Sequence, residues 1–423
     1  MRQPLGKTGN AIVRHGHALC QPADQMLLAD DRGPKSRDRS QRIWWLRHDR
    51  CMPAYRHNQD ELAREQRLLN DARSLLFGRF ADSPRPFSYV AAAADEAIGY
   101  EVDFALDHLL PWLGSNLARP ISDLLASLNA SGTTLIVSGP LASVPLHAAT
   151  WQEGGHDVCL LDRFSVRYAP SADLERLSLA RWRQAEAVPP FLVALGNPPG
   201  ANLPAAEAEV AEIKKHRRWA GRVRAAVGCR ATTEFIRAHL SSATHLHLAC
   251  HGQGSPLVYD DSFVTLADGD IRAGETVRLA GPHLALTVVS ACKTAISHAE
   301  IADEAFSIGT SFLASGSAAV VATLWSVNDY ATALLMTKFY GELLGDEKGG
   351  PSQCLRAAQT WLRDLTEPDE EAFLNAHPDL QEVATHTARG GLRTHRTRQQ
   401  RPALLARPFS HPYYWGAFVA FGV

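Results

Sequence analysis

The chain has 423 residues, a length that allows two or three domains and is ample for burying a hydrophobic core. With 45% hydrophobic and 21% charged residues, its composition excludes disordered, collagen-like and coiled-coil proteins. The 43 basic and 45 acidic residues give a formal net charge of -2, so the bulk charge predicts no nucleic-acid partner.

The N-terminus and the cysteines indicate where the protein resides. Charged residues at the N-terminus are not followed by an apolar run, which argues against a secretory signal. The most apolar stretch, Phe312 to Trp325, has 14 residues and is too short to span a bilayer. The seven cysteines contain no CxxC pair, which argues against a disulfide framework and a zinc ribbon. We therefore expect a cytoplasmic protein with no cofactor and no membrane contact.

The first part of the chain has weak structural signals. Residues 1–57 follow neither a helical nor a strand period, and residues 32–56 are rich in basic side chains, so we expect a poorly ordered arm. Amphipathic patterns then predict helices over residues 58–76, 94–113 and 121–128. No repeat with a 34-residue period precedes the later motifs.

Beyond Gly132, short apolar runs end in Gly, Pro or Ser and alternate with helical segments. The runs predict strands over residues 135–137, 164–168, 191–195, 245–249, 284–289 and 318–324. The clearest helical segments are residues 233–240, 303–314, 328–344 and 352–365. This alternation predicts an α/β fold with mostly parallel sheets flanked by helices. Similar sequences at Thr134–Pro140 and Thr287–Cys292 suggest two duplicated halves that divide near residue 230.

Two predicted strands end in residues that can carry out acyl transfer. One strand runs into Cys250-His251-Gly252, and another runs into Cys292 within a turn of small residues. Functional groups of α/β sheets gather where strands end at their carboxyl edge. A thiolate can attack a carbonyl carbon while an imidazole handles protons, and backbone N–H groups of Gly252 and Cys292 can stabilise the oxyanion.

Seven motifs in order resemble the CHAT peptidases, caspase-like cysteine proteases related to separase and caspases. The motifs span about residues 106–423 and are Leu135-Ile-Val-Ser-Gly-Pro-Leu-Ala-Ser-Val-Pro-Leu, Tyr168-Ala-Pro-Ser, Leu195-Gly-Asn-Pro-Pro with Leu203-Pro-Ala-Ala-Glu-Ala-Glu-Val, Ala249-Cys-His-Gly, Ser290-Ala-Cys, Ala322-Thr-Leu-Trp-Ser-Val-Asn-Asp and Tyr414-Trp-Gly-Ala-Phe-Val. The resemblance implies three regions. Residues 1–90 would form an N-terminal arm and helical segment, residues 91–235 a degenerate caspase-like half, and residues 236–423 the active half.

The resemblance also implies roles for individual residues. His251 matches the catalytic histidine of the family, Cys292 its nucleophile, and Gly252 a member of the oxyanion hole. The expected reaction is hydrolysis of peptide bonds in a protein substrate through a thioester, with restricted specificity. The family suggests an immune or regulated cell-death pathway in bacteria, and a regulatory protein partner is compatible with it.

The expected substrate-binding pocket involves Trp325, Ser326, Asp329 and Asp303. Asp329 would favour a basic P1 side chain through a charge-assisted hydrogen bond, although it could equally cap the helix that begins after Asn328. Asp303 could likewise serve only the N-terminus of its own helix. Trp325 could be an ordinary core aromatic residue.

Two alternative functions remain open from the sequence. His245 and His247 share a strand face with His251, which would allow a metal-dependent hydrolase, although no carboxylate motif completes such a site. A catalytically silent caspase-like interaction module is the other alternative. Cys250 alternates onto the opposite face and is expected in the core.

A basic insertion precedes the last strand. Six arginines lie between residues 389 and 407, and residues 383–423 contain no acidic residue. This composition predicts a mobile loop, which is either merely solvated or serves docking or self-processing.

Overall fold

A computed structural model describes most of the expected peptidase region. The described residues are 41–46, 99–137, 139–254, 262–279, 281–291, 294–295, 307–346, 349–389 and 407–423. The helix expected over residues 58–76 and most of the basic insertion lie outside them, as do Cys292 and Asp303.

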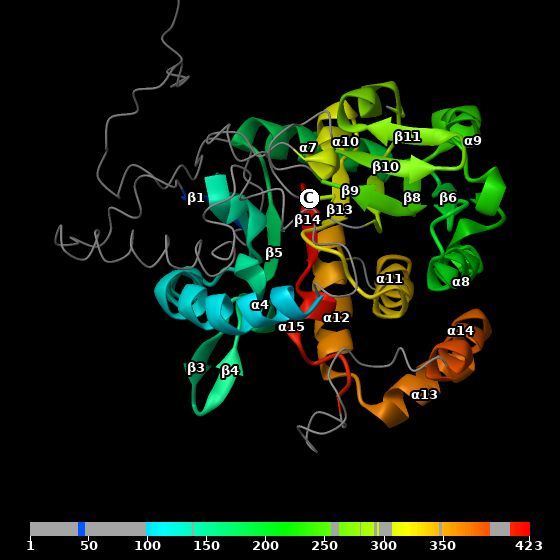
Figure 1. Cartoon of the computed structure of the whole chain (residues 1–423). Helices are drawn as coiled ribbons and strands as arrows, with labels where there is room; N and C mark the ends of the chain where they lie inside the picture. The colour runs from blue at the N-terminus through cyan, green and yellow to red at the C-terminus, as the bar shows by residue number, and fades with distance from the viewer. Residues whose placement is uncertain are drawn as a thin grey trace, which may run out of the picture.

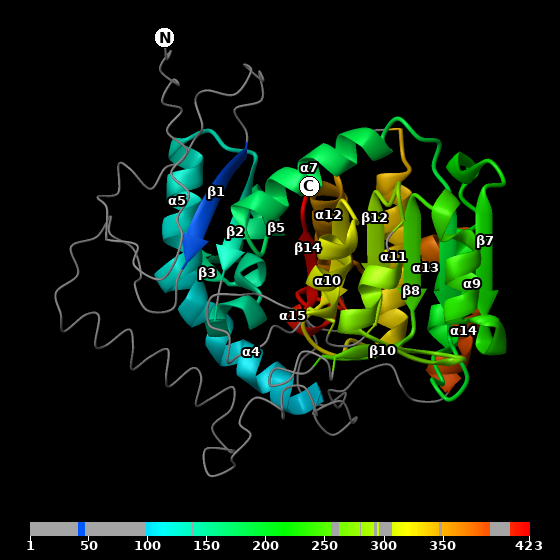
Figure 2. The same ribbon diagram turned by 90° about the horizontal axis from the view of Figure 1, so that it is seen from above.

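Nine strands form one sheet that runs through the whole molecule (Figures 1 and 2). From one edge to the other they are β1 (Gln41–Leu46), β2 (Gly132–Val137), β5 (Ser165–Tyr168), β14 (Phe418–Phe421), β13 (Ala319–Thr323), β12 (Leu286–Val289), β8 (His245–Ala249), β6 (Leu192–Gly196) and β7 (Val223–Val227). Most of these strands are buried along their whole length, as expected for a sheet covered on both faces.

The sheet consists of two parallel blocks that run in opposite directions. Strands β1, β2, β5 and β14 are mutually parallel, and so are β13, β12, β8, β6 and β7. The blocks meet where β14 pairs antiparallel with β13. The predicted α/β fold with a mostly parallel sheet is therefore confirmed, and the carboxyl ends of the two blocks lie at opposite edges.

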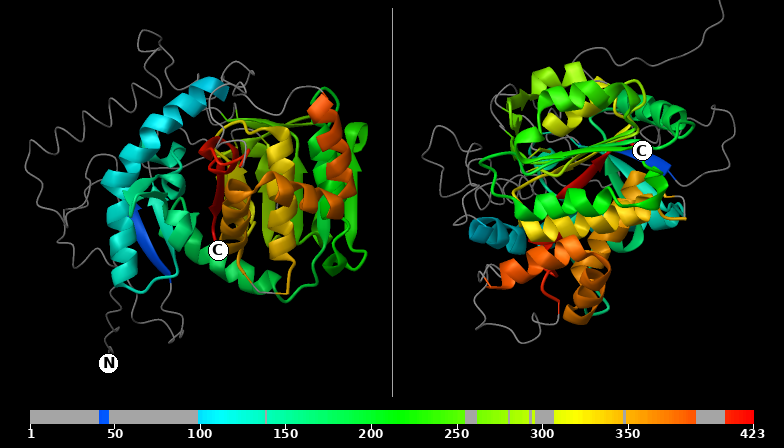
Figure 3. Two further views of the ribbon diagram at one scale, coloured as in Figure 1. Left: turned by 90° about the horizontal axis from the view of Figure 1, so that it is seen from below. Right: turned by 90° about the vertical axis from the view of Figure 1, so that its right-hand side faces the viewer.

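Helices cover both faces of this sheet (Figure 3). One face carries α7 (Ala172–Ala185), α9 (Thr233–His239) and α10 (Ile308–Ser315), and the other carries α8 (Pro204–Ile213), α11 (Asp329–Leu343) and α12 (Pro351–Asp364). Polar side chains cap the N-termini of several of these helices. Ser171 accepts a hydrogen bond from the Leu174 backbone N–H at the start of α7, and Asn328 accepts one from Ala331 at the start of α11.

Smaller elements complete the fold. On the side of the molecule that contains β1 and β2 lie α4 (Gly99–Leu113), α5 (Arg119–Ser127), α6 (Leu160–Arg163) and the hairpin of β3 (Trp151–Glu153) and β4 (His156–Val158). Helices α13 (Glu367–Ala376) and α14 (Pro378–Arg389) lie outside α8 and α11. The short helix α15 (Pro412–Trp415) precedes β14. A second sheet contains β9 (His251–Gln253), β10 (Phe263–Leu266) and β11 (Gly269–Arg272). In the part of the chain that the structure describes, no helix is both long enough and apolar enough to cross a bilayer.

Several sequence expectations need correction. Residues 41–46 belong to strand β1, so this part of the expected arm is not irregular. The strand direction changes between β5 and β6 along the chain, and β6 and β7 lie beside β8 in the same sheet. The division into two halves near residue 230 stays a prediction. The expected basic insertion begins inside α14, which extends to Arg389.

Candidate active site at the carboxyl edge of the sheet

Strands β6, β8, β12 and β13 run in the same direction and end at one edge of the sheet. The register between β8 and β12 pairs Leu248 with Val289. Three positions further along the chain from each member of this pair are His251, the first residue of β9, and Cys292, which lies outside the described residues. The described register therefore brings the two chain segments that carry the predicted pair to the same level of the sheet edge.

His251 is the first residue of β9, and its side chain is exposed. Its Nε2 atom lies 2.7 Å from the carbonyl oxygen of Ala201. Because a carbonyl oxygen can only accept, Nε2 carries the hydrogen and donates it. Nδ1 is then the ring nitrogen that can take up or release a proton.

Two hydrogen bonds of Asn197 hold the loop that contains Ala201. The Asn197 backbone N–H donates to the Ala249 carbonyl at 3.0 Å, and the Asn197 side-chain oxygen accepts from the Leu203 N–H at 2.9 Å. Asn197 has a φ of 46°, in the left-handed region that Asn tolerates better than most residues. These bonds tie the carbonyl that orients His251 to the end of β8.

The turn after β12 is anchored by Thr323 of β13. The Thr323 hydroxyl donates to the Ala291 carbonyl at 2.6 Å, and the Thr323 N–H donates to Thr294 Oγ1 at 3.1 Å. Thr294 in turn donates to the Ala291 carbonyl at 3.2 Å, and its own carbonyl accepts from Gly309 at 2.8 Å. Ala291 and Thr294, which flank the undescribed Cys292 and Lys293, are thus fixed to the neighbouring strand.

Two hydroxyl groups near this edge have no hydrogen-bond partner among the described residues. They are the buried Oγ atoms of Ser290, at the end of β12, and of Ser326, after β13. A buried polar group without a partner costs free energy, so each of these hydroxyls is suited to a hydrogen bond with an incoming group.

Trp325 has a structural role in the described fold. Its side chain is 5% exposed, and its Nε1–H donates to the Tyr413 carbonyl at 3.0 Å. The indole therefore joins the end of β13 to the segment that leads into β14. This is the packing that the core-aromatic interpretation predicts.

Asp329 caps a helix, but not the one that contains it. Its Oδ2 atom accepts a hydrogen bond from the Ala205 backbone N–H of α8 at 2.9 Å, whereas Asn328 caps α11. The pKa of Asp329 is raised to about 7, chiefly by burial and to a smaller extent by the nearby Glu209, although hydrogen bonds from the backbone N–H groups at the start of α8 lower it. The carboxylate thus helps to hold α8 and the Ala201 loop that precedes it.

The three histidines of the metal-site alternative have separate surroundings. His247 is fully buried, with Nε2 at 2.8 Å from Glu209 Oε1 and Nδ1 at 3.3 Å from the Tyr340 hydroxyl. His245 shares a hydrogen bond with Thr244 and lies against Trp219, and burial lowers its pKa to about 4. No group of three potential metal ligands occurs within the described residues. Cys250 is buried, as expected.

Sequence reasoning missed the groups that hold the site in place. Ala201 acts through its backbone carbonyl, which no side-chain pattern reveals. Thr323 and Asn197 lie within the motifs quoted above, but their hydrogen bonds connect segments that are far apart in the sequence. For Asp329 the sequence suggested a P1 contact or a cap of its own helix, but not the hydrogen bond that it accepts from a residue 124 positions away.

Comparison with known families gives one match. A family model described as CHAT domain matches residues 107–423. Comparison with curated proteins gives no match.

Solved structures provide distant similarities. A chain of the Saccharomyces cerevisiae separase-securin complex is 13% identical with a TM-score of 0.44, and the match covers 88% of this chain and 25% of that one. The complex of Porphyromonas gingivalis RgpB pro- and mature domains is 8% identical with a TM-score of 0.36, covering 84% and 76%. The Arg specific cysteine proteinase gingipain R is 8% identical with a TM-score of 0.33, covering 70% and 71%. The present chain thus spans only a quarter of that separase chain.

Proposed function

Because the chain belongs to the CHAT-domain family, we propose that it is a cysteine endopeptidase of restricted specificity in which Cys292 is the nucleophile and His251 transfers protons. The observation that supports this best is the register of β8 and β12, together with the hydrogen bond that fixes the His251 ring. A cysteine and a histidine at neighbouring strand ends are the groups that thiol-based acyl transfer requires.

In the proposed reaction, the Cys292 sulfur attacks the carbonyl carbon of the scissile peptide bond, and the thiol proton passes to Nδ1 of His251. Backbone N–H groups of Gly252 and Cys292 would stabilise the oxyanion. When the C–N bond breaks, the imidazolium returns its proton to the leaving amine. Water then hydrolyses the thioester, which releases the carboxylic acid and restores the thiol.

The pocket for the P1 side chain is proposed to include Ser326, whose buried hydroxyl has no partner among the described residues. Trp325 and Asp329 would stabilise the pocket wall rather than contact the P1 side chain, because both form hydrogen bonds to other elements. The basic P1 preference expected from the sequence would need the Asp329 carboxylate, and one of its oxygens is already bonded to α8. Asp303 stays a predicted contributor outside the described residues.

We propose that the substrate is a protein of an immune or regulated cell-death pathway, which is the role that the family resemblance suggests. A peptide library derived from a digested proteome tests the proposal. Wild-type protein should produce a defined set of new termini, and Cys292→Ala should produce none. Cys229→Ala is the matched control, because Cys229 is exposed and follows β7, which β6 separates from β8 in the sheet. Cleavage that persists in Cys292→Ala would overturn the proposal, and an uncleaved library would favour the interaction-module alternative.

A further inference from the structure

A strongly basic segment contains β7, a strand at one edge of the sheet. Residues 213–233 contain no Asp or Glu and carry seven basic side chains, namely Lys214, Lys215, Arg217, Arg218, Arg222, Arg224 and Arg230. They belong to the end of α8, to β7 and to the turns on either side of this strand. The segment lies at the opposite end of its parallel block from the junction with β14, and it has no part in the proposed chemistry.

The outer edge of β7 offers main-chain hydrogen-bonding groups. The Leu192 N–H of β6 donates to the Arg222 carbonyl at 3.0 Å, so alternate residues of β7 face β6 and the others face outward. Both outward groups of Val223 have partners, since its N–H donates to the Gly221 carbonyl and its carbonyl accepts a hydrogen bond from the Arg224 side chain. The next outward residue is Ala225, whose N–H and C=O form no hydrogen bond with any described residue. In the described part of the chain, no strand lies beyond β7.

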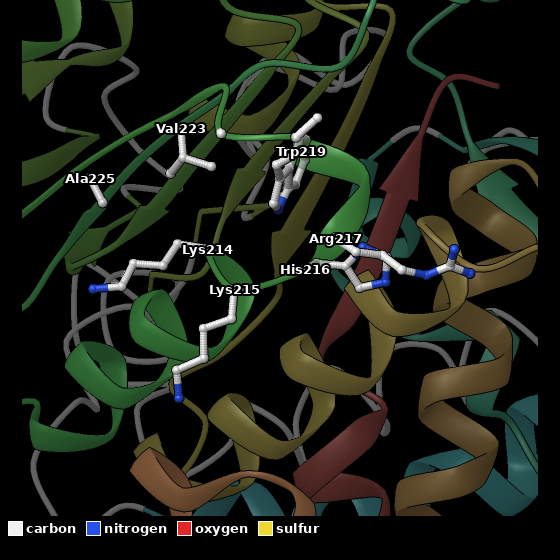
Figure 4. A pocket seen from close by; sticks show the side chains of 9 residues that line it. Lys214, Lys215, His216, Arg217, Trp219, Val223 and Ala225 are labelled. Atoms are coloured by element: carbon white, nitrogen blue, oxygen red, sulfur yellow. The ribbon is translucent and has the colours of Figure 1, made fainter.

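Cations flank this edge on both sides. A hollow of about 440 Å³ is bordered by Val223 and Ala225 of β7 and by Lys214 at the end of α8, as Figure 4 shows. On the other face of the strand, the exposed Arg224 guanidinium lies 5.8 Å from the Phe191 ring centre. Neither Lys214 nor Arg224 forms an ion pair with a described residue.

The neighbouring cations are only partly neutralised. Lys215 is paired with Glu212 and Asp379, and Arg217 and Arg218 share the single carboxylate of Asp346. The surface around β7 therefore keeps an excess of positive charge. A second copy of the same edge would be repelled by it, whereas an acidic segment would be attracted.

We propose that the outer edge of β7 binds an extended, acidic segment of a protein partner, which adds a strand to the sheet. Main-chain hydrogen bonds to Ala225 would give the segment its direction. Because side chains of a strand alternate between faces, its carboxylates would reach Lys214 on one face and Arg224 on the other. This inference is independent of the proposed peptidase activity.

A labelled peptide of repeating Glu-Glu-Val-Val units is a direct probe of this edge, because consecutive glutamates place carboxylates on both faces of a strand. Fluorescence anisotropy with the full Cys292→Ala chain at low salt should show saturable binding that weakens as salt is raised. A glutamate–proline probe has the same charge but few N–H donors, and a lysine–valine probe has the strand propensity but the wrong charge. Each should bind at least about tenfold more weakly, because each lacks one of the two interactions.

Two variants locate the binding site. Ala225→Pro removes the outward N–H of β7 at a sheet edge, where proline is tolerated, and Lys214→Glu combined with Arg224→Glu reverses the charge. Each variant should bind the glutamate–valine probe about tenfold more weakly than the unsubstituted edge does. Arg176→Glu on α7, an exposed arginine paired with Asp173, is the matched control and should bind normally. A cooperative thermal unfolding transition shows that each variant is folded. If Ala225→Pro does not fold, the charge-reversal variant alone tests whether the probe binds at β7.

Three results would overturn the proposal. Absence of saturable binding would exclude the docking site, and equal affinity for the glutamate–proline probe would reduce it to a diffuse charge effect. Displacement of the probe by a single-stranded oligonucleotide at the same concentration as by unlabelled peptide would assign the surface to nucleic acid instead.

Discussion

The hydrogen bond between His251 and the Ala201 carbonyl assigns different tasks to the two ring nitrogens. Nε2 orients the ring, and Nδ1 is left for proton transfer. In the proposed mechanism this backbone carbonyl orients the imidazole, so the mechanism requires no carboxylate or amide side chain as a third catalytic member. This detail lies beyond sequence reasoning, because a backbone acceptor leaves no residue signature.

Loss of the imidazole should nearly abolish turnover. We expect His251→Ala to lower kcat for peptide hydrolysis by about a hundredfold to ten-thousandfold, because the leaving amine would depart without a proton. Alkylation of Cys292 by iodoacetamide should continue in this variant, as followed by peptide mass spectrometry. His156→Ala, at an exposed position of β4, is the control and should keep full activity. Normal hydrolysis by His251→Ala would show that the histidine is misassigned.

Asp329 should make stability depend on pH. Its carboxyl group has a pKa of about 7 in the folded protein, compared with an ordinary value of 3.8, so the folded state holds a proton that the unfolded state releases over this range. The free energy of unfolding should therefore fall as the pH rises from about 4 to 7 and stay level above that, by at most about 4 kcal/mol, which is the free energy that corresponds to this change in pKa.

Urea unfolding at several pH values tests this expectation. Asp329→Asn keeps a side-chain oxygen for the Ala205 N–H but does not titrate, so its stability relative to the wild type should increase between pH 5 and pH 8. Parallel pH dependences of the two proteins would contradict the assigned pKa.

At the scale of elements, the strands of the sheet centre were predictable and the edge strand was not. Runs such as Ala319–Thr323 and His245–Ala249 are buried along their whole length and have few alternatives to a strand. The sequence of β7, Val223–Val227, contains two alanines and an arginine and is only half-buried, so its pattern is weak. Helix α8 was also missed, because its N-terminus is capped by Asp329 of α11 rather than by a local side chain.

The link between β13 and the turn after β12 should be sensitive to one hydroxyl group. Thr323→Val keeps the shape of the side chain but removes the donor to the Ala291 carbonyl. We expect a loss of about 1 to 2 kcal/mol in the free energy of unfolding, because this carbonyl is left with the longer bond from Thr294 alone. We also expect kcat to fall more than KM changes, since the turn leads directly into Cys292.

A matched threonine separates the two effects. Thr385→Val removes an exposed hydroxyl that donates within α14, and it should change neither stability nor kcat measurably. A Thr323→Val protein that is less stable but has an unchanged kcat would show that the hydroxyl only supports the fold.

At the scale of the whole molecule, one strand joins the two parallel blocks. β14 pairs antiparallel with β13 and parallel with β5, so the end of the chain lies near the middle of the sheet. The sequence indicated a last strand and two α/β units, but it could not reveal that the units share one sheet and run in opposite directions. That arrangement depends on pairing between residues about 250 positions apart.

The central position of β14 makes its side chains important for stability. Phe421 is buried and pairs with Val320 across the junction with β13, and its ring lies 6.2 Å from that of Tyr168 on β5 at the other side of β14. We expect Phe421→Ala to lower the free energy of unfolding by about 3 kcal/mol or more. Leu177→Ala, at a leucine that is 47% exposed, should cost less than about 0.5 kcal/mol. Equal effects in chemical denaturation would contradict the proposed role of β14 as the junction.

The proposed thioester on Cys292 can be observed directly by mass spectrometry. A thiobenzyl ester of a peptide that the enzyme cleaves has a better leaving group than an amide, so acylation should be fast and the acyl-enzyme should accumulate before hydrolysis. After an acid quench, the wild-type chain should carry the mass of the acyl group on the peptide that contains Cys292, and Cys229→Ala should behave in the same way. An acyl group on any other residue, or its appearance in Cys292→Ala, would contradict the proposed mechanism.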